Sequence, residues 1–335
     1  MTMKNILSLQ LPVEKDDYDK LPADFYKAQT SRTDEVGFWR ASWRRLRENK
    51  IAMVSLVIIL AIIVFAVLGP ILSPYSYDQQ VHGDENLWPC LKHPFGTDRL
   101  GRDLMVRCMT GTRISLLVGV VSAIIVMIIG SIYGAISGLL GGKADTIMMR
   151  IVDIIYSVPE ILLIVVIKLV IDQPLTNLVD NVPFFHPLQK LGSGLIAIFI
   201  VYGCLYWVGM ARIVRGQVLQ LKEMEYVTAS DALGAPNSWL IRQHLLPNCM
   251  GQIIATMMMQ IPSAIFTEAF LSFLGIGVSA PMASLGSLTS EALSGINRAP
   301  YRMLFPAVLI SLIILAFNLF GDGLRDALDP KMKKR

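Results

Sequence analysis

The chain has 335 residues, of which 53% are hydrophobic and only 17% are charged, and its mean hydropathy is +0.53. An ordinary soluble domain carries about 45–50% apolar and about 25% charged residues. The composition therefore excludes an ordinary soluble protein and favours one built for a lipid bilayer. The formal net charge of +4 gives no case for nucleic acid, because the basic residues gather beside the apolar runs.

The first part of the chain is polar. Residues 1–37 show no apolar period, and such a segment is expected to be a solvated, largely disordered cytoplasmic tail. The stretch 38–50, FWRASWRRLRENK, differs because Trp39, Trp43 and Leu46 recur at helical spacing among arginines. This pattern predicts a short basic helix in the lipid headgroup layer. The alternative is a plain positive flank to the apolar run that follows.

Six apolar runs come next, and a helix needs about 20 mostly apolar residues to cross a bilayer core of about 30 Å. They are Ile51–Leu72, Ile114–Leu140, Ile151–Ile171, Gly194–Ala211, Met250–Leu274 and Met303–Phe320. About fifty polar residues precede the first run, too many for a signal peptide, so we expect an uncleaved anchor. The sequence thus predicts an all-α polytopic membrane protein with six transmembrane helices. Residues 51–113 would hold the first span and an outer loop, and residues 114–330 the other five spans.

Lys and Arg in the short connections set the orientation, because they favour the cytoplasmic side. Basic residues cluster before the first span, within 212–249 and in the tail 331–335. Six spans place all three on one side, so we expect both termini in the cytoplasm and the chain in the plasma or inner membrane. The outer segment is the exception, because it contains Lys92, Arg99, Arg102, Arg107 and Arg113.

The outer segment includes HPFGTDRLGRD (93–103), whose Pro and Gly residues predict turns. We expect an ordered surface element in which Asp98 or Asp103 pairs with an arginine. Contact with cargo or with a binding protein is the alternative. Cys90 and Cys108 also lie here, and nothing in their spacing demands a disulfide.

Four glycines repeat every four residues in and just after the second span: Gly130, Gly134, Gly138 and Gly142. Glycines at this spacing share one helix face and let a neighbouring backbone approach closely. The nearby GLLGGKAD is not a phosphate-binding loop, because Ser137 and Ala144 stand where Gly and Ser or Thr are needed. The chain carries no nucleotide-binding signature, and its cysteines and histidines form no metal-binding motif.

Charged residues inside spans mark candidate functional sites, because a charge that faces acyl chains is strongly disfavoured. The candidates for a substrate pathway are Glu160, Lys168 and Glu268, with Asn318 as a polar companion. Asp153 and Lys168 lie near span ends, and the alternative is that they extend to water. Glu160 follows Pro159, which breaks a helix, so it could line that break instead of contacting cargo.

Residues 223–249 form a polar stretch between two apolar runs. Glu225–Leu233 has helix-forming spacing, and Gly234 is typical of the position just after a helix C-terminus. Pro236 can begin a second short helix that runs to about Leu245. Two short helices joined by a corner of small residues are therefore expected.

The second helix is expected to end at Pro247, which disfavours the helical state of Leu246. Ala229 and Ser230 leave the first helix with a flat surface that another molecule can approach closely, and Trp239 contributes to an apolar side of the second. This shape favours docking to another protein. The alternative is an ordinary connection, which would be shorter.

A family resemblance rests on Ala229, Ser230, Gly234, Leu246 and Pro247. They fall at the spacing of the cytoplasmic EAA loop of ABC importer permeases, which this stretch resembles. One position differs from the family pattern: the family's Glu would lie at Thr228. This chain instead has Glu225, one helical turn earlier, and this form is similar to that of the peptide-transporter branch. The further motifs similar to that branch are HPFGTDRLGRD (93–103), GGKADTIMMRIVDIIYSVP (141–159), FLGIG (273–277) and GDGLRDALDP (321–330). The resemblance covers about residues 38–330.

The resemblance implies a C-type permease of an oligopeptide or dipeptide importer, with the type I ABC importer permease fold. In that family the subunit pairs with a homologous B-type permease, two ATPase subunits lie beneath, and an extracytoplasmic peptide-binding protein delivers cargo. ATP and Mg²⁺ would bind to the ATPases, so this chain would have no cofactor and no catalytic site. The residues implied for ATPase coupling are Glu225, Ala229, Ser230, Gly234, Ala235, Pro236, Leu246 and Pro247. The segment 223–249, which we name the coupling loop, would transmit ATPase movement to the spans as a rigid lever.

Other functions stay open. ABC importers of nickel or glutathione share this type of permease, and no residue of the chain separates the cargoes. A proton-coupled secondary transporter would use intramembrane carboxylates and would need no docking surface. A membrane enzyme would need a paired nucleophile and base or a metal site within the spans, and the sequence shows neither.

Overall fold

The computed structural model describes residues 38–182, 192–278 and 282–328. The chain divides into two units, residues 1–44 and residues 45–335. The first is described only where helix α2 (Phe38–Glu48) begins. This helix confirms the helical part of the prediction for 38–50, and its placement at a membrane surface stays a prediction. The predicted tails, 1–37 and 331–335, lie outside the described residues.

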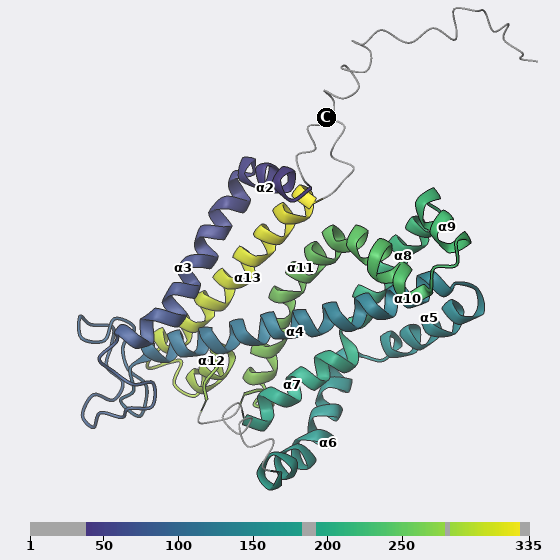
Figure 1. Cartoon of the computed structure of the whole chain (residues 1–335). Helices are drawn as coiled ribbons and strands as arrows, with labels where there is room; N and C mark the ends of the chain where they lie inside the picture. The colour runs from purple at the N-terminus through teal and green to yellow at the C-terminus, as the bar shows by residue number, and fades with distance from the viewer. Residues whose placement is uncertain (1–37, 183–191, 279–281, 329–335) are drawn as a thin grey trace, which may run out of the picture. The chain divides into compact units, whose positions relative to one another are not determined.

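The described residues of the second unit are helical apart from turns and connections (Figure 1). The longer helices are α3 (Lys50–Leu72), α4 (Leu104–Leu140), α5 (Gly142–Ser157), α6 (Glu160–Asn181), α7 (Gly192–Leu205), α8 (Trp207–Lys222), α11 (Leu246–Phe273) and α13 (Tyr301–Leu328). The shorter ones are α9 (Glu225–Ala232), α10 (Asn237–Leu240), the π-helical turn η3 (Ile241–Leu245) and α12 (Leu285–Leu293). Six stretches of the described residues are long and apolar enough to cross a membrane. The all-α fold with six spans is thereby confirmed.

The second span begins at Leu104, earlier than the predicted Ile114. Asp103 sets this start, because its Oδ1 accepts a hydrogen bond of 2.8 Å from the N–H of Val106 and so caps the helix. The first turns contain Arg107, whose charge hid the helix from a search for apolar runs.

The predicted third span, Ile151–Ile171, is wrong, because the chain is interrupted in its middle. Val158 is extended, with φ −88° and ψ 137°, and α6 begins at Glu160. Pro159 causes this break, since the residue before a proline is disfavoured in the α region. The apolar stretch able to cross a membrane lies later, over Ile161–Leu178.

The fourth span is longer than the predicted Gly194–Ala211, because it continues to Lys222. A short break at Tyr206 separates α7 from α8. The prediction stopped where the first arginines appear. In the structure Arg215 is paired with Asp145, so its charge does not end the helix.

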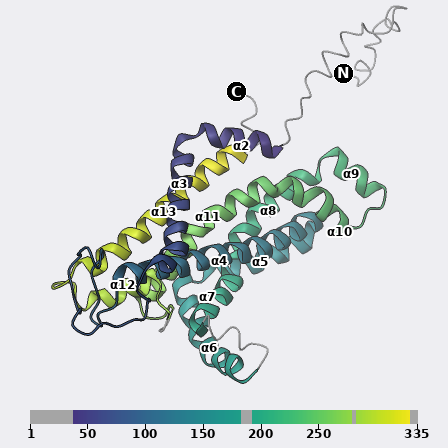
Figure 2. The same ribbon diagram turned by 60° about the vertical axis from the view of Figure 1, so that its left-hand side comes forward.

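Helix α4 contacts α3, α7, α8 and α11, and it runs through the middle of the spans in both views (Figure 1, Figure 2). Its glycines explain the close contact with α8. A Cβ added at Gly130 would lie 2.6 Å from Cβ of Met210, and one added at Gly134 would meet the carbonyl oxygen of Ala211. The predicted glycine face therefore packs against protein. Gly142 is not part of it, because a Cβ there would meet nothing within 4 Å.

Arg113 supports a proline inside α3. Pro70 has no N–H to donate to the carbonyl of Ala66 in the preceding turn. The Nε of Arg113 donates to that carbonyl at 3.2 Å, and its Nη2 donates to the carbonyl of Val67 at 3.2 Å. One of the basic residues that disagreed with the predicted orientation therefore has a structural role.

Candidate functional site

The coupling loop begins with α9, which ends in a glycine turn. Gly234 has a φ of +85°, in the left-handed region. The N–H of Ala235 donates to the carbonyl of Ser230 at 3.1 Å, and the N–H of Gly234 donates to the carbonyl of Asp231 at 2.9 Å. These two bonds form a Schellman motif, which confirms that Gly234 ends the helix. A Cβ at Gly234 would meet nothing within 4 Å, so the backbone angle rather than crowding requires glycine.

The second arm of the loop, α10 with η3, does not end where predicted. Leu246 has helical angles, φ −60° and ψ −44°, and the helix continues from Asn237 to Phe273. The prediction that Pro247 ends the second helix is therefore wrong. The N–H of Leu246 donates to the carbonyl of Ile241, five residues earlier. This wider turn relieves the clash that a proline ring causes in an ordinary helix, and the second arm is one rod with the fifth span.

His244 holds α9, the first arm, against the second. Its Nε2 lies 3.2 Å from Oγ of Ser230. Its ring makes edge-to-face contacts with Tyr226 and Trp239, with ring centroids 5.5 and 4.9 Å apart. Each such contact stabilises by about 0.5–1.5 kcal/mol. Sequence reasoning missed His244 and Tyr226. The available signal was that Tyr226 and Ser230 lie one turn apart on the same face of α9.

Part of the coupling loop faces outward, while Val227, Leu240 and Leu245 are buried in the core. Leu233 is 89% exposed, Met224 48% and Trp239 44%. The predicted coupling residues that are exposed are Glu225, Ala229, Gly234, Pro236 and Pro247, and those that are half-buried are Ser230, Ala235 and Leu246. Exposed apolar side chains on a stiff, polar segment are typical of a surface that contacts another protein.

Two polar contacts fasten the base of the coupling loop to α4 and α5. The Nε and Nη2 of Arg215 donate to Oδ1 and Oδ2 of Asp145 at 2.6 and 2.5 Å, and Oγ of Ser137 donates to Oδ1 at 2.6 Å. The Nζ of Lys222 donates to the carbonyl of Leu139 in the last turn of α4 at 2.6 Å. The guanidinium of Arg215 holds the pKa of Asp145 below its ordinary value, so the carboxylate stays charged.

The predicted pathway residues have different environments. Glu268 is fully buried, where Oγ of Ser115 donates to it at 2.9 Å and Oγ of Ser272 at 2.7 Å. Asn318 lies on an exposed position of α13. The side chain of Glu160 is outside the described residues. The role of these three residues in a pathway stays a prediction.

Lys168 and Asp153, the two charged residues expected near span ends, differ in their exposure to solvent. Lys168 is buried, and its Nζ donates to the carbonyl of Gly277 at 3.2 Å. The alternative that it extends to water is therefore wrong. Asp153 accepts a hydrogen bond of 2.8 Å from Nη2 of Arg212, and both side chains are partly exposed.

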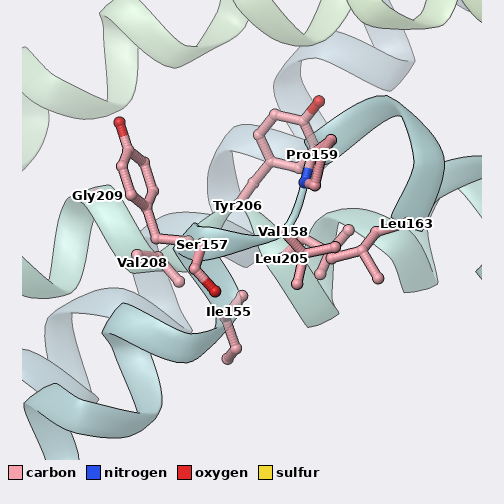
Figure 3. Close-up of a pocket in the computed structure, with 10 residues that line it drawn as sticks. Ile155, Ser157, Val158, Pro159, Leu163, Leu205, Tyr206, Val208 and Gly209 are labelled. Atoms are coloured by element: carbon pink, nitrogen blue, oxygen red, sulfur yellow. The ribbon is translucent and has the colours of Figure 1, made fainter.

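A cavity of about 440 Å³ lies where two helix breaks meet. Figure 3 shows Val158 and Pro159, from the α5–α6 break, beside Leu205 and Tyr206, from the α7–α8 break. Interrupted helices at membrane depth are tolerated where protein or a water-filled cavity surrounds them. The ten lining residues are mostly apolar and include no acidic or basic side chain, so they offer no acid–base pair.

At the other end of α4, Asp98 orders the outer segment as predicted. Its Oδ2 accepts hydrogen bonds from Nε of Arg102 at 2.6 Å and from Nη1 of Arg107 at 2.8 Å. Asp103 pairs with a histidine instead, since its Oδ2 lies 2.7 Å from Nδ1 of His93.

The described part of the chain shows neither a metal-binding group nor a disulfide. Within it, no group of three or more His, Cys, Asp or Glu side chains could hold a metal ion. Cys90 is exposed, Cys108 is buried, and both are free thiols.

Residues 130–334 match the family "Binding-protein-dependent transport system inner membrane component", and residues 37–89 match "N-terminal TM domain of oligopeptide transport permease C". The chain is 43% identical over 322 residues to the oligopeptide transport system permease protein OppC of Bacillus subtilis (strain 168), over 96% of this chain and 99% of that protein. It is 42% identical over 340 residues to the dipeptide transport system permease protein DppC of the same strain, over 97% and 100%. It is also 36% identical over 296 residues to the glutathione transport system permease protein GsiD of Pectobacterium atrosepticum, over 88% and 92%.

Proposed function

Because the chain belongs to the family of binding-protein-dependent transport system inner membrane components, we propose that it is a permease subunit of an ATP-driven importer of oligopeptides or dipeptides. The cargo class follows that of relatives whose similarity extends over nearly the whole chain. Glutathione is the second candidate, because a glutathione permease is also similar. The subunit would form half of the translocation pathway.

The coupling loop is the observation that carries this function. It is exposed where a partner would touch it, and its second arm is continuous with the fifth span. A stiff helix transmits a displacement, whereas a flexible loop absorbs it. The predicted coupling residues around Gly234 would rest in a groove of an ATPase subunit, and closure of the ATPases on ATP would move the loop and rock the spans.

The proposed assembly contains a homologous B-type permease, two ATPase subunits and an extracytoplasmic peptide-binding protein. ATP and Mg²⁺ would bind to the ATPases, and this chain would hold no cofactor and perform no catalysis. Its two termini and the coupling loop would lie in the cytoplasm. Apolar side chains exposed along α3 and α6, such as Val57 and Leu169, are suited to contact with lipid or with the second permease.

The cavity at the two helix breaks is our candidate for this chain's part of the pathway. Broken helices commonly form the binding region of transporters near the bilayer midplane. Glu160 directly follows Pro159, which lines the cavity, so its carboxylate is the pathway candidate nearest to it in the sequence. Glu268 and Asn318 stay further candidates.

Reconstitution in liposomes tests the function. Uptake of a labelled dipeptide or oligopeptide should require ATP on the ATPase side, both ATPase subunits and the binding protein. Competition by unlabelled peptides, glutathione and nickel salts would identify the cargo class. Uptake by this chain alone, driven by an imposed proton gradient, would contradict the proposal and support a secondary transporter.

A further inference from the structure

A pocket of about 360 Å³ lies between the outer segment, α12 and the start of α13. Its charged lining, which we name the arginine pocket, consists of Arg99, Arg102, Arg107, Arg302, Asp98 and Glu291. Four arginines thus accompany two carboxylates, and the pocket has two positive charges in excess. Apolar side chains, those of Leu104, Leu288 and Ala292, line the remainder together with Leu100.

Both carboxylates of the arginine pocket are already bound. The Nη1 of Arg107 donates to Asp98 and to Glu291 at 2.8 Å each, and its Nη2 donates to Glu291 at 3.1 Å. The Nε of Arg102 donates to Asp98 at 2.6 Å. These bonds tie the outer segment to α12, and neither acid lies within ion-pair distance of the remaining buried arginine.

That remaining arginine is Arg302, which is only 5% exposed. Its Nε and Nη2 are buried and make no hydrogen bond with any residue that the structure describes. A guanidinium stays charged at physiological pH, and a buried charge without a counter-charge is strongly destabilising. A folded chain that holds such a group at the wall of a pocket indicates a site for an anion from another molecule.

We propose that the arginine pocket binds a carboxylate and that this group is the C-terminal carboxylate of the peptide cargo; the inference rests on the proposed function. A guanidinium fork matches a carboxylate with two parallel hydrogen bonds. The pocket volume lies at the lower end of the range for ligand sites, about 300–1,000 Å³, so it fits the end of a peptide better than a whole one. The C-terminus has no residue beyond it, so it can enter a pocket of this size, which Arg302, Leu288 and Ala292 line together.

Transport of matched peptides tests this site. The complete reconstituted transporter, with its binding protein, is given one peptide in two forms, with a free C-terminal carboxylate and with a C-terminal carboxamide. The wild type should take up the acid faster than the amide. Arg302→Gln should lower this acid-to-amide ratio about tenfold, the effect of losing a hydrogen bond to a charged group. Comparing the ratio between variants cancels any preference of the binding protein.

Arg298→Gln is the matched control, because Arg298 is exposed, lies four residues earlier in the turn before α13 and does not line the pocket. It should keep the wild-type ratio. Equal losses of acid and amide uptake in Arg302→Gln would overturn the inference, because Arg302 would then not act through the carboxylate of the cargo. That result would not contradict the proposed function, which is contradicted only if the wild-type complex transports no peptide.

A measurement on the wild type avoids any folding defect of the variant. A peptide with a photoreactive residue at its C-terminus should label the segment that contains residues 288–302. The same residue at the N-terminus of the peptide should not. Labelling of this segment by neither peptide, or by both equally, would overturn the inference.

Discussion

The coupling loop and the polar cluster of Asp98, Arg102, Arg107 and Glu291 lie at opposite ends of α4 and are stabilised in different ways. The cluster ties the outer segment to α12 through ion pairs in which the side chain of Arg107 is 4% exposed. The coupling loop is held by one glycine turn and the contacts of His244, and Leu233 at its tip is 89% exposed. Changes in the cluster should therefore cost stability, and changes in the loop should cost coupling.

Asp98→Ala should have the largest effect on stability. Asp98 accepts hydrogen bonds from the N–H groups of Leu100 and Arg102 and from the side chains of Arg102 and Arg107. Its loss removes these hydrogen bonds and one of the two carboxylates that pair with the buried Arg107, and should lower the free energy of unfolding by about 3 kcal/mol, measured by thermal unfolding of the purified complex. Asp78→Ala is the control, because Asp78 is exposed in the same segment. Equal shifts in both variants would show that the cluster does not stabilise this end.

Gly234→Ala should have a smaller effect on stability and a larger one on transport. A non-glycine residue in the left-handed region costs about 1–2 kcal/mol, which shifts the turn and misplaces α9. We expect peptide uptake per ATP hydrolysed to fall several-fold while the complex still assembles, and Gly234→Pro should reduce it further. Gly216→Ala is the matched control, since Gly216 lies in α8 with an equally open Cβ position and no positive φ. Unchanged uptake per ATP in Gly234→Ala would argue against a rigid lever.

His244→Ala should loosen the loop more mildly, by about 1 kcal/mol, because it removes ring contacts with Tyr226 and Trp239. His244→Phe keeps those contacts and loses only the bond to Ser230. Hydrogen exchange of the backbone amides of α9 is the measurement. We expect exchange to be fastest in His244→Ala, slower in His244→Phe and slowest in the wild type. Equal protection in all three would show that His244 does not hold the two arms together.

The smallest effect is the pH dependence at the base of the loop. Because Arg215 lowers the pKa of Asp145 below the ordinary 3.8, the stabilisation is fully present above that pH. It is lost only as pH falls through the lowered pKa. Thermal unfolding should thus show no contribution of Asp145 to pH dependence between pH 5 and pH 8, and Asp145→Asn should lose stability at neutral pH. A transition of the wild type near neutral pH that Asp145→Asn removes would contradict this.

The sequence predicted those features that depend on composition or on one residue's backbone preference. The apolar runs predicted the number of spans, and Gly234 predicted the end of α9. The break at Pro159 was visible as a local signal, yet the apolar run on both sides concealed it. The continuous helix through Pro247 depends on a wider turn that the pattern of residues does not reveal.

Helix α12 and the arginine pocket could not be predicted from the sequence for a different reason. Helix α12 is short and begins with a capping box between Ser284 and Ser287, a weaker signal than a capping Glu. The ion pairs join Arg107 to Glu291, which lie 184 residues apart in the sequence. Such a pairing depends on how helices pack, which one sequence without structure does not specify.

A disulfide or bifunctional crosslink from the tip of the coupling loop to an ATPase subunit tests the central claim most directly. Leu233→Cys is better placed than a cysteine at the half-buried Ala235, and the exposed Cys90 and Cys204 are first replaced by serine. Leu91→Cys, fully exposed in the outer segment, is the control. We expect Leu233→Cys to crosslink to the ATPase with a yield that changes between the nucleotide-free and ATP-bound complex, and Leu91→Cys not to crosslink. An intact, transporting complex in which Leu233→Cys never crosslinks to the ATPase would contradict the account.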